Sequence, residues 1–261
     1  MIGFLLRKTF YDLWDNMFKI VVINFGFIII AMIPAVLTSL AVKFFSSIIL
    51  EIAITAAGIL VCSVYLAAAA YTLKPVSDYG TFGFGDFFSN IKKAWSAGLV
   101  MGFFVFLIFL VATVVIPFYL SMESPVMGLA LAAVIFWAAV FALLSFQFYF
   151  AVYARLGSNL KKSFKKCMII SLDNSGFSLF MLLHNTVALV LSVIFLFLFP
   201  GPAGVLLYLD EALRLRILKY DWLEANPDAN RRRIPWDALL IDEREKTGTR
   251  SLRNFIFPWK D

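Results

Sequence analysis

The chain has 261 residues, of which 62% are hydrophobic and only 15% are charged, and its formal net charge is +6. Soluble globular chains have roughly 45–50% apolar and about 25% charged residues, so this composition excludes a water-soluble domain as the main body. The apolar residues form runs of about 20, the length that crosses a hydrocarbon core of roughly 30 Å. The predicted class is therefore an all-α polytopic membrane protein.

Six segments are predicted to form transmembrane helices, the last of them interrupted by charges. They cover residues 20–43, 47–73, 96–120, 126–154, 175–199 and 203–222. Short links join the members of each pair, and short links connect antiparallel neighbours. We therefore expect a bundle of three antiparallel hairpins in one domain over 1–222, followed by a cytoplasmic C-terminal tail over 223–261.

Basic residues indicate the orientation, because Lys and Arg in short loops are retained on the cytoplasmic side. They precede the first hairpin and fill both links between hairpins, whereas only Lys43 lies at the opposite ends of the helices. The basic set is Arg7, Lys8, Lys19, Lys74, Lys92, Lys93, Arg155, Lys161, Lys162, Lys165 and Lys166. We expect a cytoplasmic N-terminus, with the cluster from Arg155 to Lys166 facing anionic lipids. Topology explains this charge without a nucleic-acid partner.

The sixth segment has two interpretations, because acidic and basic residues follow its apolar start. Asp210 and Arg214 stand at i, i+4 and would pair if the helix spans or half-spans with its charges facing the bundle. The C-terminus is then cytoplasmic. If the segment does not span, the tail with its Arg231–Arg233 triplet lies outside, against the charge rule.

An amphipathic stretch with an Asn near its end precedes each hairpin. The three residues are Asn16, Asn90 and Asn174. We interpret each stretch as an interfacial helix that turns into the membrane at the Asn, whose side chain would bond backbone groups freed at the corner. The alternative is that the three Asn residues coincide by chance.

The most polar cluster inside a predicted span is His184-Asn185-Thr186. Intramembrane polar residues suggest a functional site, here a proton relay or ligand site with Glu51 or Asp210 as partner. The alternative is that they form hydrogen bonds between helices and stabilise packing. Glu51 has a second alternative, an ion pair with Lys43 across the first hairpin.

No catalytic site is predicted. Two cysteines, Cys62 and Cys167, and the single histidine provide neither a disulfide framework nor a zinc-site spacing. The spans carry no nucleophile and base set, so we expect no metal, no cofactor and no enzymatic activity.

The tail contains apolar positions suited to a short amphipathic helix after Pro235. They are Trp236, Leu239 and Leu240, followed by Glu243. The chain then ends in an aromatic group, Phe255, Phe257, Pro258 and Trp259. These aromatics either return to the inner face of the bundle or dock on a partner.

Two motifs, "FYDLWDNMFKIVVIN" at 10–24 and "FGFGDFFSNIKKAW" at 82–95, together with the helix count, resemble the YesL-like family of bacterial membrane proteins. The resemblance covers residues 1–222 and implies a polytopic inner-membrane protein that assists a carbohydrate importer. The tail from Leu223 departs from the short ends typical of that family. The expected function is a non-catalytic accessory or scaffold subunit, with a transporter as possible partner. The alternative is a small transporter or channel with a mid-membrane polar site that combines His184, Asn185, Glu51, Asp210 and Arg214.

Overall fold

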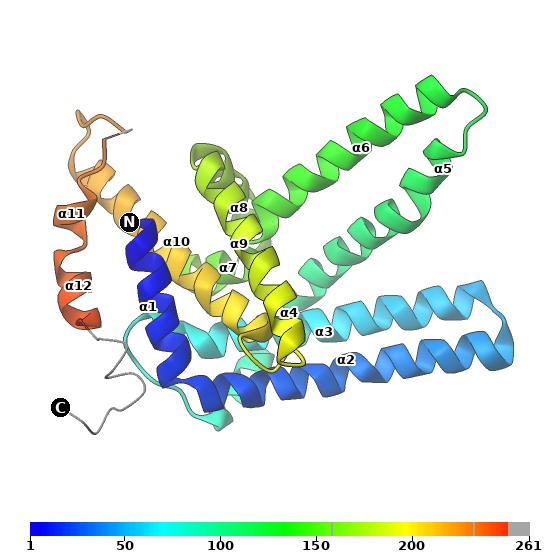
Figure 1. Ribbon diagram of the computed structural model, residues 1–261, viewed down its shortest axis with the longest axis horizontal. Coiled ribbons are helices and arrows are strands. Elements are labelled where there is room, and N and C mark those ends of the chain that lie inside the picture. Colours follow the sequence, from blue (N-terminus) through cyan, green and yellow to red (C-terminus); the bar gives the residue numbers. More distant parts are fainter. Residues whose placement is uncertain (158, 232, 250–261) are drawn as a thin grey trace.

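A computed structural model describes residues 1–157, 159–231 and 233–249, and this part of the chain is helical throughout, without a strand (Figure 1). The elements are α1 (Ile2–Asp15), α2 (Met17–Phe45), α3 (Ile48–Ser77), α4 (Phe84–Leu110), the π-helix η1 (Val111–Val115), α5 (Ile116–Leu120), α6 (Pro125–Phe146), α7 (Tyr149–Leu156), α8 (Leu160–Asp173), α9 (Ser175–Ile194), α10 (Gly201–Ala225), α11 (Trp236–Leu239) and α12 (Ile241–Thr247).

Five helical segments are long and apolar enough to cross a membrane. They are Met17–Phe45, Ile48–Ser77, Phe84–Leu120, Pro125–Leu156 and Ser175–Ile194. The predicted class of an all-α polytopic membrane protein is therefore confirmed. The predicted sixth segment forms α10, which is long enough, but its many charged residues keep it out of this apolar set.

The helices form hairpins (Figure 1). The α2–α3 hairpin and the hairpin of α4–α5 with α6 extend in the same general direction and diverge toward their tips. The third pair, α9 and α10, is antiparallel, because Asn174 at the start of α9 contacts Tyr220 late in α10 while Ser192 contacts Gly201. We call the end where α1, α10, α11 and α12 gather the polar end of the molecule.

Helices α3 and α4 pack closely through two glycines one turn apart. A methyl group built on Gly98 would collide with the backbone of Val64, and one on Gly102 would lie 3.0 Å from Cα of Leu60. Small residues four positions apart let membrane helices approach each other closely. This packing fixes the first two hairpins to one another near the polar end.

The second hairpin lacks the separate interfacial helix that was predicted before it. Helix α4 runs without interruption from Phe84 to Leu110, so Asn90 lies inside a helix rather than at a corner, and this prediction is wrong. The Asn90 amide instead donates to Thr72 of α3 at 3.1 Å. The irregularity in this helix comes later, where η1 precedes Pro117, because proline cannot donate the regular hydrogen bond and crowds the preceding turn.

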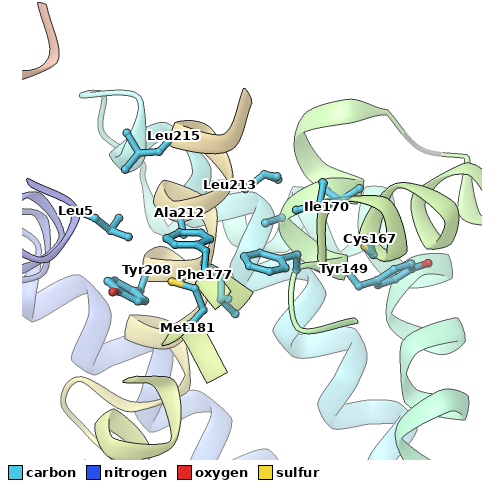
Figure 2. Close-up of a cluster of buried hydrophobic side chains, with 14 of the residues drawn as sticks. Leu5, Tyr149, Cys167, Ile170, Phe177, Met181, Tyr208, Ala212, Leu213 and Leu215 are labelled. Carbon is cyan, nitrogen blue, oxygen red and sulfur yellow. The ribbon is translucent and has the colours of Figure 1, made fainter. Parts of the chain in front are cut away.

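Helix α10 passes through the centre of the molecule and contacts α1, α2, α3, α7 and α9. It supplies five buried residues to the largest apolar cluster, including Tyr208 and Leu213 (Figure 2). Its first turn lies beside Asn24 near the start of α2, and Asp210 reaches Ser77 at the end of α3. The remainder of α10 therefore continues past the end of α3 into the polar end.

Candidate functional site

Charged side chains are buried along α10 in unusual number. Asp210, Glu211, Arg216 and Lys219 are each at least nine-tenths buried, and Arg214 is partly buried. Buried charges are costly unless they are paired and hydrogen-bonded. The ionic partners of Asp210, Glu211, Arg214 and Lys219 come from α1, α7, α8, α12 and the segment that follows α3, and we call these ion pairs the α10 charge network. Arg216 instead donates to the Asn174 side-chain oxygen and lies over the Phe177 ring.

The first group of this network surrounds Asp210. Arg155 of α7 binds both carboxylate oxygens of Asp210 and donates to Asp78 at 3.0 Å, while the Ser77 hydroxyl donates to Asp210 at 2.5 Å. Burial raises the pKa of Asp210, and the hydrogen bonds from Arg155 and Ser77 oppose that rise. The predicted pair of Asp210 with Arg214 is not formed, because the guanidinium of Arg155 offers two parallel donors to the same carboxylate.

The second group holds the C-terminal helix α12 against the rest of the chain. Arg214 donates to Glu243 at 2.7 Å, and the Tyr79 hydroxyl donates to the same carboxylate at 2.8 Å. The Arg214 guanidinium also lies 5.0 Å from the centre of the Tyr79 ring. The described part of the tail therefore docks on the helices of residues 1–222, with Leu240 and Glu243 buried.

The third group joins α1 to α10. The ammonium of Lys8 lies 2.5 Å from Asp12 and 3.4 Å from Glu211, and Thr9 donates to Glu211. Lys8 and Glu211 are both almost fully buried. Burial raises the pKa of Glu211, and the neighbouring Lys8 opposes that rise.

The fourth group lies at the corner between α8 and α9. Lys219 donates to Asp173 at 2.9 Å and to the Asn174 side-chain oxygen at 2.8 Å, and the Asn174 amide donates to Tyr220 at 2.7 Å. Burial alone would raise the pKa of Asp173, but the hydrogen bonds from Lys219 and Tyr220 lower it overall. Asn174 thus lies at a corner, as predicted, but most of its partners belong to α10 rather than to the corner itself.

The link between α9 and α10 is bound by Asn24, a residue that sequence reasoning missed. Its amide donates to the carbonyls of Leu198 and Pro200 at 2.9 and 2.8 Å, and its oxygen accepts from Ala203 N–H at 2.8 Å. Asn24 is completely buried. A lone Asn in an apolar span was the available signal, since such residues usually have a partner.

The His184 and Asn185 pair lines a pocket of about 270 Å³ between α1, α9 and α10. His184 stacks on Tyr208 with ring centres 3.9 Å apart. Neither Glu51 nor Asp210 lines this pocket. The predicted polar site is therefore divided, with its histidine and asparagine here and Asp210 and Arg214 in the charge network.

Glu51 lies in the first turn of α3, at the opposite end of that helix from Ser77. Among the described residues no ion pair joins it to Lys43, whose ammonium instead lies 5.4 Å from the Phe44 ring centre. The predicted pair across the hairpin is therefore not formed, because the helix ends leave both side chains partly exposed and able to extend apart.

The remaining predicted residues divide between buried and exposed positions. Arg155 does not face lipid as predicted, because its side chain is 9% exposed and bound to Asp210. Lys161, Lys162 and Lys165 of α8 are exposed, whereas Lys166 donates to the Leu156 carbonyl at 2.9 Å. The corner between α1 and α2 is occupied by Asn16, whose amide donates to the Asp12 carbonyl.

Some expectations fall on other parts of the chain. The aromatic group at Phe255, Phe257, Pro258 and Trp259 lies outside the described residues. Within the described residues no group of His, Cys, Asp and Glu side chains has the arrangement of a metal site.

Comparison of the chain with models of protein families, with curated proteins and with solved structures gave no match, so the resemblance to the YesL-like family stays a prediction.

Proposed function

We propose that this protein is a non-catalytic accessory or scaffold subunit of a complex in the bacterial inner membrane, associated with carbohydrate or other solute import. The observation that carries the proposal is the α10 charge network. A carrier keeps charged groups available to a cavity near the membrane centre. Here Asp210 and Arg214 are bound by Arg155, Asp78 and Glu243 at the polar end instead.

The network suits a protein that holds other elements in fixed positions. Removing one partner of a buried ion pair costs about 3–5 kcal/mol, so each pair resists separation of the helices that it joins. The pairs of Glu211, Asp210 and Arg214 together connect α1, α7, α10 and α12. The polar end is therefore a rigid platform, and its surface would keep the same shape when a partner binds.

The membrane helices favour association as well. In the segment Phe84–Leu120 only 6% of the most apolar stretch is buried within the chain, and in Pro125–Leu156 the share is 11%. Beyond the contacts of α4 with α3 and of α6 with α8, much of the second hairpin is thus available to lipid or to another membrane protein. Membrane helices associate by close packing of small residues, which α6 presents as Ala130 and Ala133 on its exposed surface.

The charge distribution supports a cytoplasmic location for both termini in this proposal. The exposed lysines of α8 would lie at the inner leaflet and attract anionic lipids, at about 1 kcal/mol each. The docked helix α12 would then belong to the cytoplasmic platform, and the exposed apolar side chains of α1 beside it would lie in the inner interface of the membrane.

A small transporter remains the alternative, and the pocket at His184 and Asn185 favours it. That pocket has an apolar lining apart from a few polar groups. Transport would require the pocket to connect to both sides of the membrane, with His184 and Asn185 along the route.

The proposal is tested by purification from native membranes in a gentle detergent. We expect a membrane protein of the import type to co-purify at constant stoichiometry with the tagged chain. The variant Ala133→Phe, which enlarges an exposed apolar position on α6, should reduce its recovery several-fold, because lipid tolerates the larger ring and a packed interface does not.

The matched control is Ala53→Phe, the same change at an exposed position of α3 in the first hairpin. Recovery of the partner should stay unchanged there. A lone monomer or homo-oligomer in every preparation would contradict the scaffold proposal and direct attention to uptake assays with His184→Ala.

A further inference from the structure

The pocket between α1, α9 and α10 has the size and lining of a ligand site. Its volume of about 270 Å³ lies close to the lower end of the range of roughly 300–1,000 Å³ that small-molecule pockets occupy. Its wall is mainly apolar and contains no charged side chain; it includes Leu6, Leu13, Val187, Ala188, Leu191 and Val205. An occupant with a mainly apolar body and no charge therefore fits it.

The inner wall of the pocket carries polar atoms without partners. Asn185 and Tyr208 are 6% and 2% exposed, yet the Asn185 side-chain oxygen and the Tyr208 hydroxyl make no hydrogen bond within the described part of the chain, and neither does Nδ1 of His184. An unmet hydrogen-bonding group in a buried site costs about 1–3 kcal/mol. A bound hydroxyl would satisfy two of these groups, the Asn185 oxygen and the Tyr208 hydroxyl.

The orientation of Tyr208 agrees with this arrangement. Its ring belongs to the apolar cluster, and its hydroxyl is directed away from Met181 and Phe177 (Figure 2). The His184 ring stacks on the Tyr208 ring with centres 3.9 Å apart, so the polar atoms of the two side chains lie close together. The unpartnered atoms thus come from both α9 and α10, at one wall of the pocket.

The mouth of the pocket opens on an apolar surface. Leu6 and Phe10 of α1 and Val187 and Leu191 of α9 line it and are each exposed by more than a third. Because α9 is one of the apolar spans, this surface faces hydrocarbon when the helix lies in a membrane. The occupant would therefore enter from the bilayer rather than from water.

We propose that this pocket binds an uncharged membrane amphiphile with a free hydroxyl, such as a long-chain alcohol or a neutral glyceride. Its hydroxyl donates to the Asn185 oxygen and accepts from the Tyr208 hydroxyl, and its chain leaves between α1 and α9. A phosphate group does not fit, because it cannot donate to Asn185 when ionised and finds no cation in the lining. This inference is independent of the scaffold proposal.

The test uses the full-length protein in detergent and hexadecanol that carries a diazirine on its chain. After illumination, labelled peptides are located by mass spectrometry. We expect labels on α9, α10 and α1 that unlabelled hexadecanol displaces at concentrations where hexadecane and phosphatidic acid do not. Tyr208→Phe keeps the ring and removes one donor, and should weaken the apparent affinity by about tenfold.

A second variant tests the pocket itself and leaves its hydrogen-bonding side chains unchanged. Ala188→Trp fills the pocket from α9 and should abolish the displaceable labelling. Tyr119→Phe on α5 makes the same change as Tyr208→Phe away from the pocket, so it is the matched control for that variant and should not alter the labelling. The proposal would be overturned if hexadecane competed as well as hexadecanol, or if the labels spread over the exposed faces of α2 to α6. It would also be overturned if the Tyr208→Phe and Ala188→Trp variants both bound hexadecanol with unchanged affinity.

Discussion

Arg155 of α7 donates from Nε and Nη2 to the two carboxylate oxygens of Asp210 on α10, over distances of 2.7 and 2.6 Å. The two side chains are 9% and 4% exposed, so the pair is almost fully removed from solvent. Helices α7 and α10 are distant in the sequence, and this ion pair fixes the position of α7 against α10. Its loss should affect the whole polar end.

The single change Asp210→Ala should lower the free energy of unfolding by about 3–5 kcal/mol, because it leaves the guanidinium buried with less compensation. The double variant Arg155→Met and Asp210→Leu should lose less than Asp210→Ala alone, since no uncompensated charge remains. Unfolding by sodium dodecyl sulfate in mixed micelles measures both. Additive losses from the two positions would contradict a direct pair.

This pair illustrates what the sequence alone can predict. The run of basic residues that Arg155 begins predicts a lipid-facing position for it, and the spacing of one helical turn predicts a pair of Asp210 with Arg214. Both assignments used local spacing, which is reliable for a helix but does not say which distant helix lies opposite. The hairpins themselves were predictable, since short polar links between apolar runs leave few other arrangements.

Asn24 should be essential for the link between α9 and α10. Asn24→Ala removes the partners of two carbonyls and one N–H group, at Leu198, Pro200 and Ala203. We expect a loss of about 3 kcal/mol or more in the free energy of unfolding, at roughly 1–3 kcal/mol for each buried group left unsatisfied. A cysteine introduced at Phe197 should also react faster with a thiol reagent in this background.

The matched control for Asn24 is Asn226→Ala at the end of α10. The Asn226 side chain is exposed and donates to one carbonyl, that of Trp222. Its replacement should change the free energy of unfolding by less than about 0.5 kcal/mol. A similar loss in the two variants would show that the buried contacts of Asn24 do not stabilise the fold.

The corners between helices were only partly predictable. Asn16 and Asn174 each separate two helices, whereas Asn90 continues within α4. The lysines after Asn90 indicated a membrane boundary, but a boundary does not require a break, because one helix can leave the membrane and continue in water. The side chain of Asn90 is satisfied by Thr72 of the adjacent helix, which spacing along one segment cannot reveal.

The contact between α3 and α4 should depend on Gly98. Gly98→Ala places a methyl group against the backbone of Val64, which cannot yield without moving the helix. We expect a destabilisation of about 1–3 kcal/mol, as for other overpacked sites. Gly85→Ala, in the first turn of the same helix, meets nothing within 4 Å and should be neutral or stabilising by up to about 1 kcal/mol. Equal effects of the two changes would contradict close packing at Gly98.

Glu211 should make stability depend on pH in a defined direction. Burial raises its folded-state pKa above the unfolded value of 4.5, against the opposing effect of Lys8, with Asp12 and Thr9 as the other facing groups. Between these two pKa values the folded chain holds a proton that the unfolded chain releases. Stability from this group is therefore fully present below pH 4.5 and is lost as the pH rises through the folded pKa.

Glu211→Gln cannot titrate, so it should flatten the decline of the unfolding free energy as the pH rises from about 4.5 toward neutrality. Asp210 also has a raised pKa, so some decline should remain in the variant. Asp237→Asn is the control, because that carboxylate is 94% exposed in its pair with Arg244 and should leave the slope unchanged. Detergent unfolding at a series of pH values measures the slopes. Identical slopes for Glu211→Gln and the unaltered chain would mean that Glu211 is ionised in the folded protein at every pH tested, held charged by Lys8.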